Sequence, residues 1–148
     1  MATTSLQRGD LLMLVAVLAA VGVADAAYLT YEWYVPANFC DISPTLNCSK
    51  VRASPYAVIG GVPTAVVGLG GFLILLGLAA LGLRGVPSLW RWSTDQWLLA
   101  FALLGAAIGV VLTLVEIFLI GAICILCVVG FALDLGIVGL AVMLRRAA

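Results

Sequence analysis

Charged residues are scarce in this chain, and that scarcity excludes a soluble fold. Of its 148 residues only 9% are Asp, Glu, Lys or Arg, whereas 65% are hydrophobic. Soluble domains carry about 25% charged residues, and a mean hydropathy of +1.25 is incompatible with one of this length. The sequence therefore predicts an integral membrane protein.

Basic stretches and histidine are missing as well. The 7 basic residues balance the 7 acidic ones and form no basic run, so the chain lacks the electrostatic footprint of a nucleic acid binder. The absence of histidine excludes haem ligation by imidazole and catalysis by a histidine base or a Ser–His–Asp triad. We expect no nucleic acid partner and no imidazole chemistry.

Four apolar runs are long enough to cross a membrane, because a helix needs about 20 residues to span the ~30 Å hydrocarbon core. They lie at approximately residues 11–34, 61–83, 97–120 and 122–144. No internal boundary or low-complexity tract separates them. We predict an all-α membrane protein in which residues 1–148 form one four-transmembrane-helix bundle.

The basic residues indicate how this bundle is oriented. Four spans put both termini on one side, which then carries five of the basic residues, while the other side carries Lys50 and Arg52. The positive-inside rule makes the termini cytoplasmic and the first loop extracytoplasmic, in a multi-pass protein of the cell membrane. In that loop Ser54 and Pro55 have the form of an N-cap and a first helical residue, which predicts a short interfacial helix over residues 55–59. The five basic residues of the terminal side are Arg8, Arg84, Arg91, Arg145 and Arg146.

The 4 cysteines form two pairs at the predicted outer face. Cys124 and Cys127 begin the last span, where residues three apart on a helix approach the ~5.5 Å Cα separation of a disulfide. The helix dipole favours a thiolate there, and this argument makes Cys124 the more acidic thiol. Cys40 and Cys48 flank a loop of turn formers and are either a static disulfide or a mobile shuttle. The presence of both pairs at one face favours the shuttle.

The cysteines of the last span share a helix face with two other residues. Cys124, Cys127, Phe131 and Asp134 fall within about 80° of one another, so this stripe is predicted to face the bundle interior. Zinc is the other generic use of four cysteines, but a loop pair separated by seven residues and a pair at a membrane helix fit structural zinc poorly. We therefore predict no metal site.

Acidic residues inside the spans are costly and usually functional or paired. Glu116 lies eight residues before Cys124, across a tight hairpin, and hence at a similar depth. It either relays protons for the dithiol or is simply hydrogen-bonded near the interface. Asp25 and Asp134 are weaker candidates on the same argument.

The order of these features resembles a known family. An outer-loop Cys40-x7-Cys48 pair is followed by Ser54 six residues later and by Cys-x-x-Cys at the outer end of the last of four spans. This arrangement is similar to the vitamin K epoxide reductase family and its bacterial and archaeal homologues, as are the segments at residues 54–63 and 116–124. The analogous disulfide-forming protein B family has the two cysteine pairs in the reverse order.

The resemblance implies a thiol:quinone oxidoreductase. It implies a quinone of menaquinone or ubiquinone type near the outer surface, with Cys127 contacting it, Cys124 as its resolving partner, and Cys40 and Cys48 as the shuttle. A reduced extracytoplasmic thioredoxin-fold protein would supply the electrons, so that disulfide bonds form outside the cell. The choice of Cys127 conflicts with the acidity argument for Cys124, and we prefer it because proximity to the quinone can outweigh thiol acidity.

The resemblance also predicts a quinone pocket made by Ser54, Tyr56, Thr64, Glu116 and Phe131. Phe131 stands where the family has a tyrosine, four residues after the second active-site cysteine, so stacking is kept but the phenolic hydrogen bond is lost. Thr64 is only a loose match to the pocket asparagine of vertebrate members. Reduction of a vitamin K epoxide, as in the vitamin K cycle, therefore stays an alternative activity.

The redox partner is expected to be a separate protein. Many prokaryotic members of the family carry a fused thioredoxin-like domain, whereas this chain ends soon after the fourth span.

Two other classes of function are possible alternatives. A non-catalytic membrane scaffold with two static disulfides is the alternative outside enzymes. A small transporter is disfavoured because charges paired through the membrane and inverted repeats are not evident.

Overall fold

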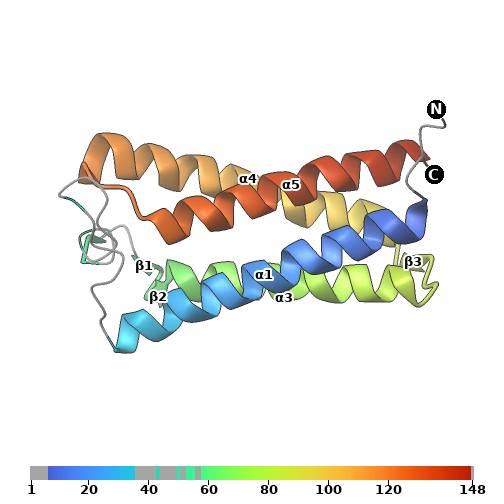
Figure 1. The fold of residues 1–148 in the computed structure, drawn as a ribbon, viewed down its shortest axis with the longest axis horizontal. Helices are drawn as coiled ribbons and strands as arrows, with labels where there is room; N and C mark the ends of the chain where they lie inside the picture. Colours follow the sequence, from blue (N-terminus) through green and yellow to red (C-terminus); the bar gives the residue numbers. More distant parts are fainter. Residues whose placement is uncertain (1–6, 36–42, 44–49, 51–52, 56–57, 148) are drawn as a thin grey trace.

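Four long antiparallel helices make up most of the molecule (Figure 1). The computed structural model describes residues 7–35, 43, 50, 53–55 and 58–147. The helices are α1 (Arg8–Tyr34), α3 (Thr64–Leu83), α4 (Thr94–Val115) and α5 (Ile125–Ala147), and the π-helical turn η2 (Glu116–Ile120) continues α4.

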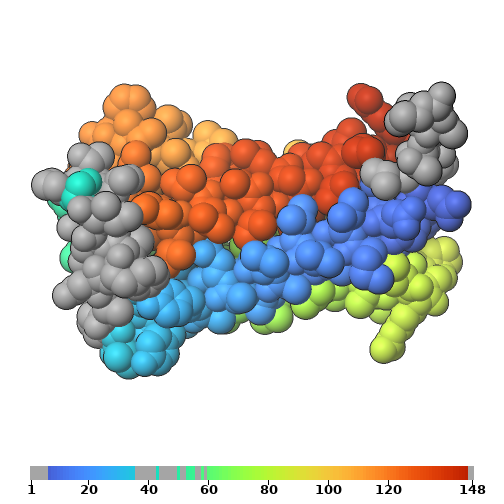
Figure 2. All heavy atoms as spheres, viewed as in Figure 1, coloured from blue at the N-terminus to red at the C-terminus, as the bar shows by residue number. Residues whose placement is uncertain are grey.

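The four helices confirm the predicted class. Each of them, α4 together with η2, is long and apolar enough to cross a membrane. Helix α1 packs against α3 and α5, and α4 packs against the same two helices, so the four form a ring. The space-filling view shows α1 and α5 in contact along the length of one face (Figure 2).

Two small antiparallel hairpins lie just before α3 and α4. The first joins β1 (Val58–Ile59) to β2 (Val62–Pro63), and the second joins β3 (Ser88–Leu89) to β4 (Trp92–Ser93). The predicted short helix over residues 55–59 is therefore wrong at its last two residues. The reason is the two-residue turn at Gly60 and Gly61, which joins the two strands of the hairpin. Such turns require positive φ angles, here 57° and 85°, and glycine adopts these readily.

Most of the apolar core lies in the half of the bundle that is remote from Cys124. All four long helices contribute to it, and seven of its residues have no measurable exposure. Large apolar side chains are also exposed around the bundle, as expected of a surface that faces lipid. The core residues without exposure are Val15, Ala19, Ala79, Leu98 and Ala102, together with Ile137 and Ala141 on α5 at the same 0%.

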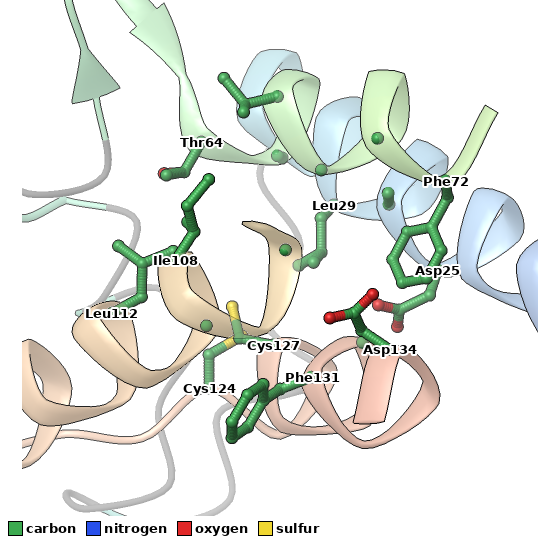
Figure 3. Close-up of a pocket in the computed structure, with 18 of the residues that line it drawn as sticks. Asp25, Leu29, Thr64, Phe72, Ile108, Leu112, Cys124, Cys127, Phe131 and Asp134 are labelled. Atoms are coloured by element: carbon green, nitrogen blue, oxygen red, sulfur yellow. The ribbon is translucent and has the colours of Figure 1, made fainter. Parts of the chain in front are cut away.

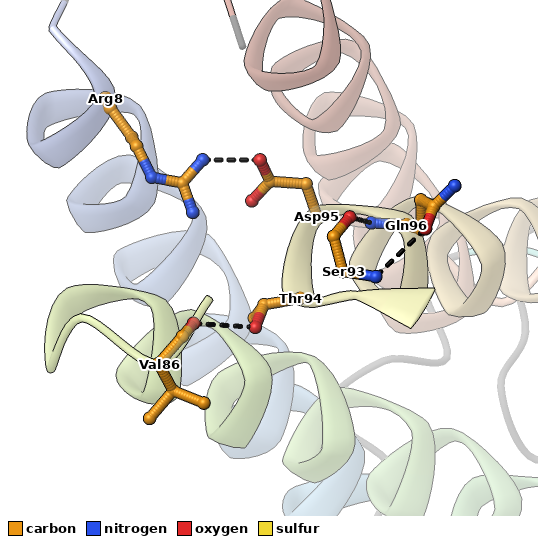
Figure 4. Close-up of polar contacts among 6 residues, drawn as sticks. All are labelled: Arg8, Val86, Ser93, Thr94, Asp95 and Gln96. Atoms are coloured by element: carbon orange, nitrogen blue, oxygen red, sulfur yellow. Dashed lines mark hydrogen bonds and ion pairs between the residues drawn. The ribbon is translucent and has the colours of Figure 1, made fainter. Parts of the chain in front are cut away.

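Polar contacts hold the helices together at the end where α1 begins (Figure 4). Ser93 and Gln96 form a capping box at the start of α4, with hydrogen bonds of 3.2 and 2.9 Å. The Thr94 hydroxyl donates a 2.8 Å hydrogen bond to the Val86 carbonyl. We call this end, which comprises Arg8, residues 86–97 and the contacts among them, the closed end of the bundle. The opposite end, which contains Cys124, is called the cysteine end.

Candidate functional site

A cavity of about 490 Å³ lies between the four helices and extends to the cysteine end. Its volume falls in the ~300–1,000 Å³ range of small-molecule sites. Most of its walls are apolar, from α1, α3, α4 and α5, and Figure 3 shows part of this lining. The chemically active side chains that line it are Asp25, Glu32, Glu116, Cys124, Cys127 and Asp134.

The Cys124–Cys127 dithiol sits at the start of α5. Cys124 precedes the helix, and its carbonyl accepts a 3.0 Å hydrogen bond from the backbone N–H of Val128, whereas Cys127 lies inside the first turn. Cys124 is only 2% exposed. The two side chains hydrogen-bond to each other, and the hydrogen bond from Cys127 lowers the pKa of the Cys124 thiol. This direction agrees with the acidity predicted from the helix terminus.

Glu116 contacts this dithiol directly. Its carboxyl group accepts a hydrogen bond from the backbone N–H of Cys124, and the residue is 5% exposed. It is also a hydrogen-bond acceptor for the Cys127 thiol, whose single S–H can point either to Glu116 or to Cys124. The position follows from η2, because the Gly121 N–H donates to the Glu116 carbonyl at 2.9 Å and Gly121 reverses the chain with a φ of 74°. π-Helical turns occur frequently at functional sites. A carboxylate in contact with a thiol can accept the proton that the thiol loses.

Phe131 forms the wall next to the dithiol (Figure 3). Its ring packs against the backbone of α4 at Gly109, where an added Cβ would lie 2.3 Å from the ring atom Cδ1. Phe72 of α3 packs in the same way against Gly22 of α1, where the corresponding distance is also 2.3 Å. The cavity thus has aromatic walls whose positions depend on glycines of neighbouring helices.

The structure brings together most of the residues predicted to bind a quinone. Ser54, Thr64, Glu116 and Phe131 all line the cavity that contains the dithiol. The predicted interior stripe is also found, because Cys124, Cys127, Phe131 and Asp134 share this lining. Three predicted residues, Cys40, Cys48 and Tyr56, lie outside the described residues.

Two acids of α1 were missed as cavity residues or given little weight. Asp25 and Glu32 both line the cavity, and Glu32 is fully buried, with a hydrogen bond to Tyr28 one turn earlier. Their spacing of seven residues places them on one helix face, which was a usable signal. Among the residues that the structure describes, no group of three Cys, Asp or Glu side chains can hold a metal ion.

A four-helix bundle with membrane-spanning helices, and with a dithiol and a carboxylate at an apolar cavity, defines a class of membrane-embedded thiol oxidoreductases. The chain belongs to the vitamin K epoxide reductase family, which it matches over residues 13–142. The match covers most of the chain and confirms the resemblance seen in the sequence. Members of this oxidoreductase family act in membranes and are associated with the reduction of quinones and vitamin K by thiols.

Proposed function

We propose that the protein is a thiol:quinone oxidoreductase that oxidises an extracytoplasmic thioredoxin-fold partner and so supports disulfide bond formation. The observation that carries this proposal is the dithiol at the cavity, with Glu116 in contact with both cysteine residues. An inert scaffold has no need for a hydrogen-bonded carboxyl group, since buried acids of this kind are costly.

The reaction consists of two thiol exchanges and one oxidation. The partner's two thiols become a disulfide as the Cys40–Cys48 disulfide is reduced, and this loop dithiol then reduces the Cys124–Cys127 disulfide. In the last step two S–H bonds of Cys124 and Cys127 break and one S–S bond forms. Two electrons and two protons leave for the two oxygens of the quinone, which becomes a hydroquinone. The balance requires no other oxidant or reductant.

Side chains around the dithiol have distinct roles in that last step. Cys127 contacts the quinone and Cys124 is the resolving cysteine, a choice supported by the place of Cys127 inside the first turn of α5, one turn before Phe131. Glu116 accepts the proton of the Cys127 thiol, with which it is hydrogen-bonded. Phe131 provides a flat surface on which a quinone ring can stack.

The cavity suits a quinone of menaquinone or ubiquinone type. Its apolar walls match a flat, largely apolar head group, and Ser54 and Thr64 provide hydroxyl groups in its lining. The bound quinone would supply the two-electron acceptor.

The basic residues support an extracytoplasmic site. Arg8 begins α1, Arg145 and Arg146 end α5, and Arg84 follows α3, so all four lie at the end of the bundle opposite the dithiol. By the positive-inside rule that end is cytoplasmic. The dithiol then faces the compartment in which disulfides form and persist.

The test is quinone reduction by purified protein in detergent, with either dithiothreitol or a reduced thioredoxin-fold protein as donor. We expect Cys127→Ala to abolish turnover with both donors. Cys48→Ala should lose turnover with the protein donor and keep it with dithiothreitol, which can reach the inner pair without a shuttle. Substantial turnover by Cys127→Ala would contradict the proposal, and no turnover of the parent with several quinones would favour the scaffold.

A further inference from the structure

Two carboxyl groups lie deeper in the cavity than the dithiol and have no role in the reaction described above. Asp25 of α1 and Asp134 of α5 project toward the same part of the cavity, beside Phe72 (Figure 3). Asp134 is 6% exposed, and its Oδ2 atom has no hydrogen-bond partner within the described part of the chain. A buried polar atom of this kind needs a hydrogen-bond partner, which a molecule bound in the cavity can provide.

Each of the two carboxyl groups packs against a glycine of a neighbouring helix, where the absence of a Cβ leaves room for it. An added Cβ at Gly130 of α5 would lie 3.1 Å from Oδ2 of Asp25, so the Asp25 carboxyl group lies directly against α5. An added Cβ at Gly105 of α4 would lie 3.1 Å from both carboxyl oxygens of Asp134. Gly130 is one turn before Asp134 on α5. The Asp25 carboxyl group of α1 therefore lies against the turn of α5 next to the one that bears Asp134.

The surroundings favour a hydrogen-bond donor at this place. No Lys or Arg is among the described residues that line the cavity, so neither carboxyl group has a cation beside it there. Two uncompensated negative charges close together in a membrane interior are strongly unfavourable. A pair of carboxyl groups in this position therefore retains at least one proton, and a protonated carboxyl group can donate a hydrogen bond.

The spacing along α5 fits a ligand with oxygens at its two ends. Cys127 and Asp134 are seven residues apart, which places them on one face of the helix about 10.5 Å apart along its axis. Phe131 lies between them on the same face and has no hydroxyl group. A 1,4-quinone stacked on Phe131 would present one oxygen to the dithiol and the other to the carboxyl groups.

We propose that Asp134, assisted by Asp25, forms a second polar subsite that hydrogen-bonds the quinone oxygen remote from the dithiol. This inference rests on the proposed function. It adds to that function a place for the second oxygen of a 1,4-quinone, since the two oxygens of such a ring point in opposite directions. The same hydrogen bond stabilises the negative charge that develops on this oxygen as electrons arrive from the dithiol.

The test compares Asp134→Leu with Asp134→Asn, with menadione, a 1,4-naphthoquinone, as the probe. Menadione affinity is measured in the Cys127→Ala background by quenching of Trp33 fluorescence, because Trp33 lines the cavity. The KM for menadione is measured with dithiothreitol as donor in the presence of Cys127. Leu should raise the dissociation constant and KM about tenfold by removing one hydrogen bond, whereas Asn, which keeps an N–H donor, should stay within about threefold of the parent.

Asp95→Asn serves as the matched control, since Asp95 is a buried acid at the closed end. It should leave menadione affinity unchanged. Unchanged affinity in Asp134→Leu would overturn the subsite, and so would an equal loss in Asp134→Asn, because a donor alone would then not suffice. Retained turnover in Cys127→Ala would instead overturn the proposed function, and it is read independently of the binding measurement.

Discussion

The two ends of the bundle use their polar side chains in opposite ways. At the closed end Arg8 pairs with Asp95, and the indole N–H of Trp97 donates to the Leu89 carbonyl at 2.8 Å. At the cysteine end the buried acids face a cavity, and Glu116 contacts thiols. Polar groups at one end join helices, whereas at the other they are available for chemistry.

Backbone geometry follows the same division. Helix α4 begins with a regular capping box at the closed end and ends as the π-helical turn η2 at the cysteine end. Most of the apolar core also lies in the half of the bundle that adjoins the closed end. A well-packed half can hold the helices in place while the other half contains a cavity and an irregular turn.

Glu116 gives the largest expected effect after the cysteines themselves. Glu116→Gln keeps the size of the side chain but cannot accept the thiol proton, so kcat for quinone reduction should fall about 10²-fold, in the range for a lost general base. The measurement is stopped-flow quinone reduction with dithiothreitol as donor. Asp95→Asn is the control at the closed end and should keep kcat, while parent-like kcat in Glu116→Gln would remove the base from the mechanism.

Gly109 tests whether the wall of the cavity is set by helix packing. Gly109→Ala would place a Cβ 2.3 Å from the ring of Phe131, so the ring must leave its position in the cavity wall. We expect KM for menadione to rise about tenfold, on the scale of a lost aromatic contact. Gly139→Ala is the matched control, because no atom lies within 4 Å of an added Cβ there. An equal KM in both variants would show that the ring position does not limit binding.

Cys124 gives a smaller effect that sharpens the comparison by pH. The hydrogen bond from Cys127 lowers the pKa of the Cys124 thiol, so its thiolate persists to a lower pH than that of an ordinary cysteine. In a Cys40→Ser, Cys48→Ser background the rate at which iodoacetamide alkylates Cys124 should therefore rise with pH, with a midpoint below that of a free thiol. Replacing Cys127 by Ala should move the midpoint upward, and an unchanged midpoint would show that the hydrogen bond has no influence.

Periodicity and composition were sufficient to predict the helical bundle, because apolar runs of ~20 residues have few alternatives in a membrane. They also predicted the interior stripe that includes Phe131 and Asp134, since a helix fixes which residues share a face. The hairpin at Val58 and Ile59 was not predicted, because two-residue strands depend on a turn rather than on a pattern. Asp25 received too little weight, because its approach to α5 at Gly130 depends on contacts between helices that no local pattern encodes.

Variants of the Arg8–Asp95 ion pair should have the smallest effect, and they should change stability rather than quinone reduction. Arg8 is 44% exposed at its side chain, so water screens the pair, and Arg8→Gln should lower the free energy of unfolding by only about 1 kcal/mol. Asp95 is more buried, with Oδ1 already lacking a partner in the described residues, so Asp95→Asn should cost at least as much. Thermal unfolding in detergent measures both, and quinone reduction measured in parallel should be unchanged. A loss of turnover without a loss of stability would mean that the closed end is coupled to the dithiol, and the division of the bundle into a holding half and a reacting half would then fail.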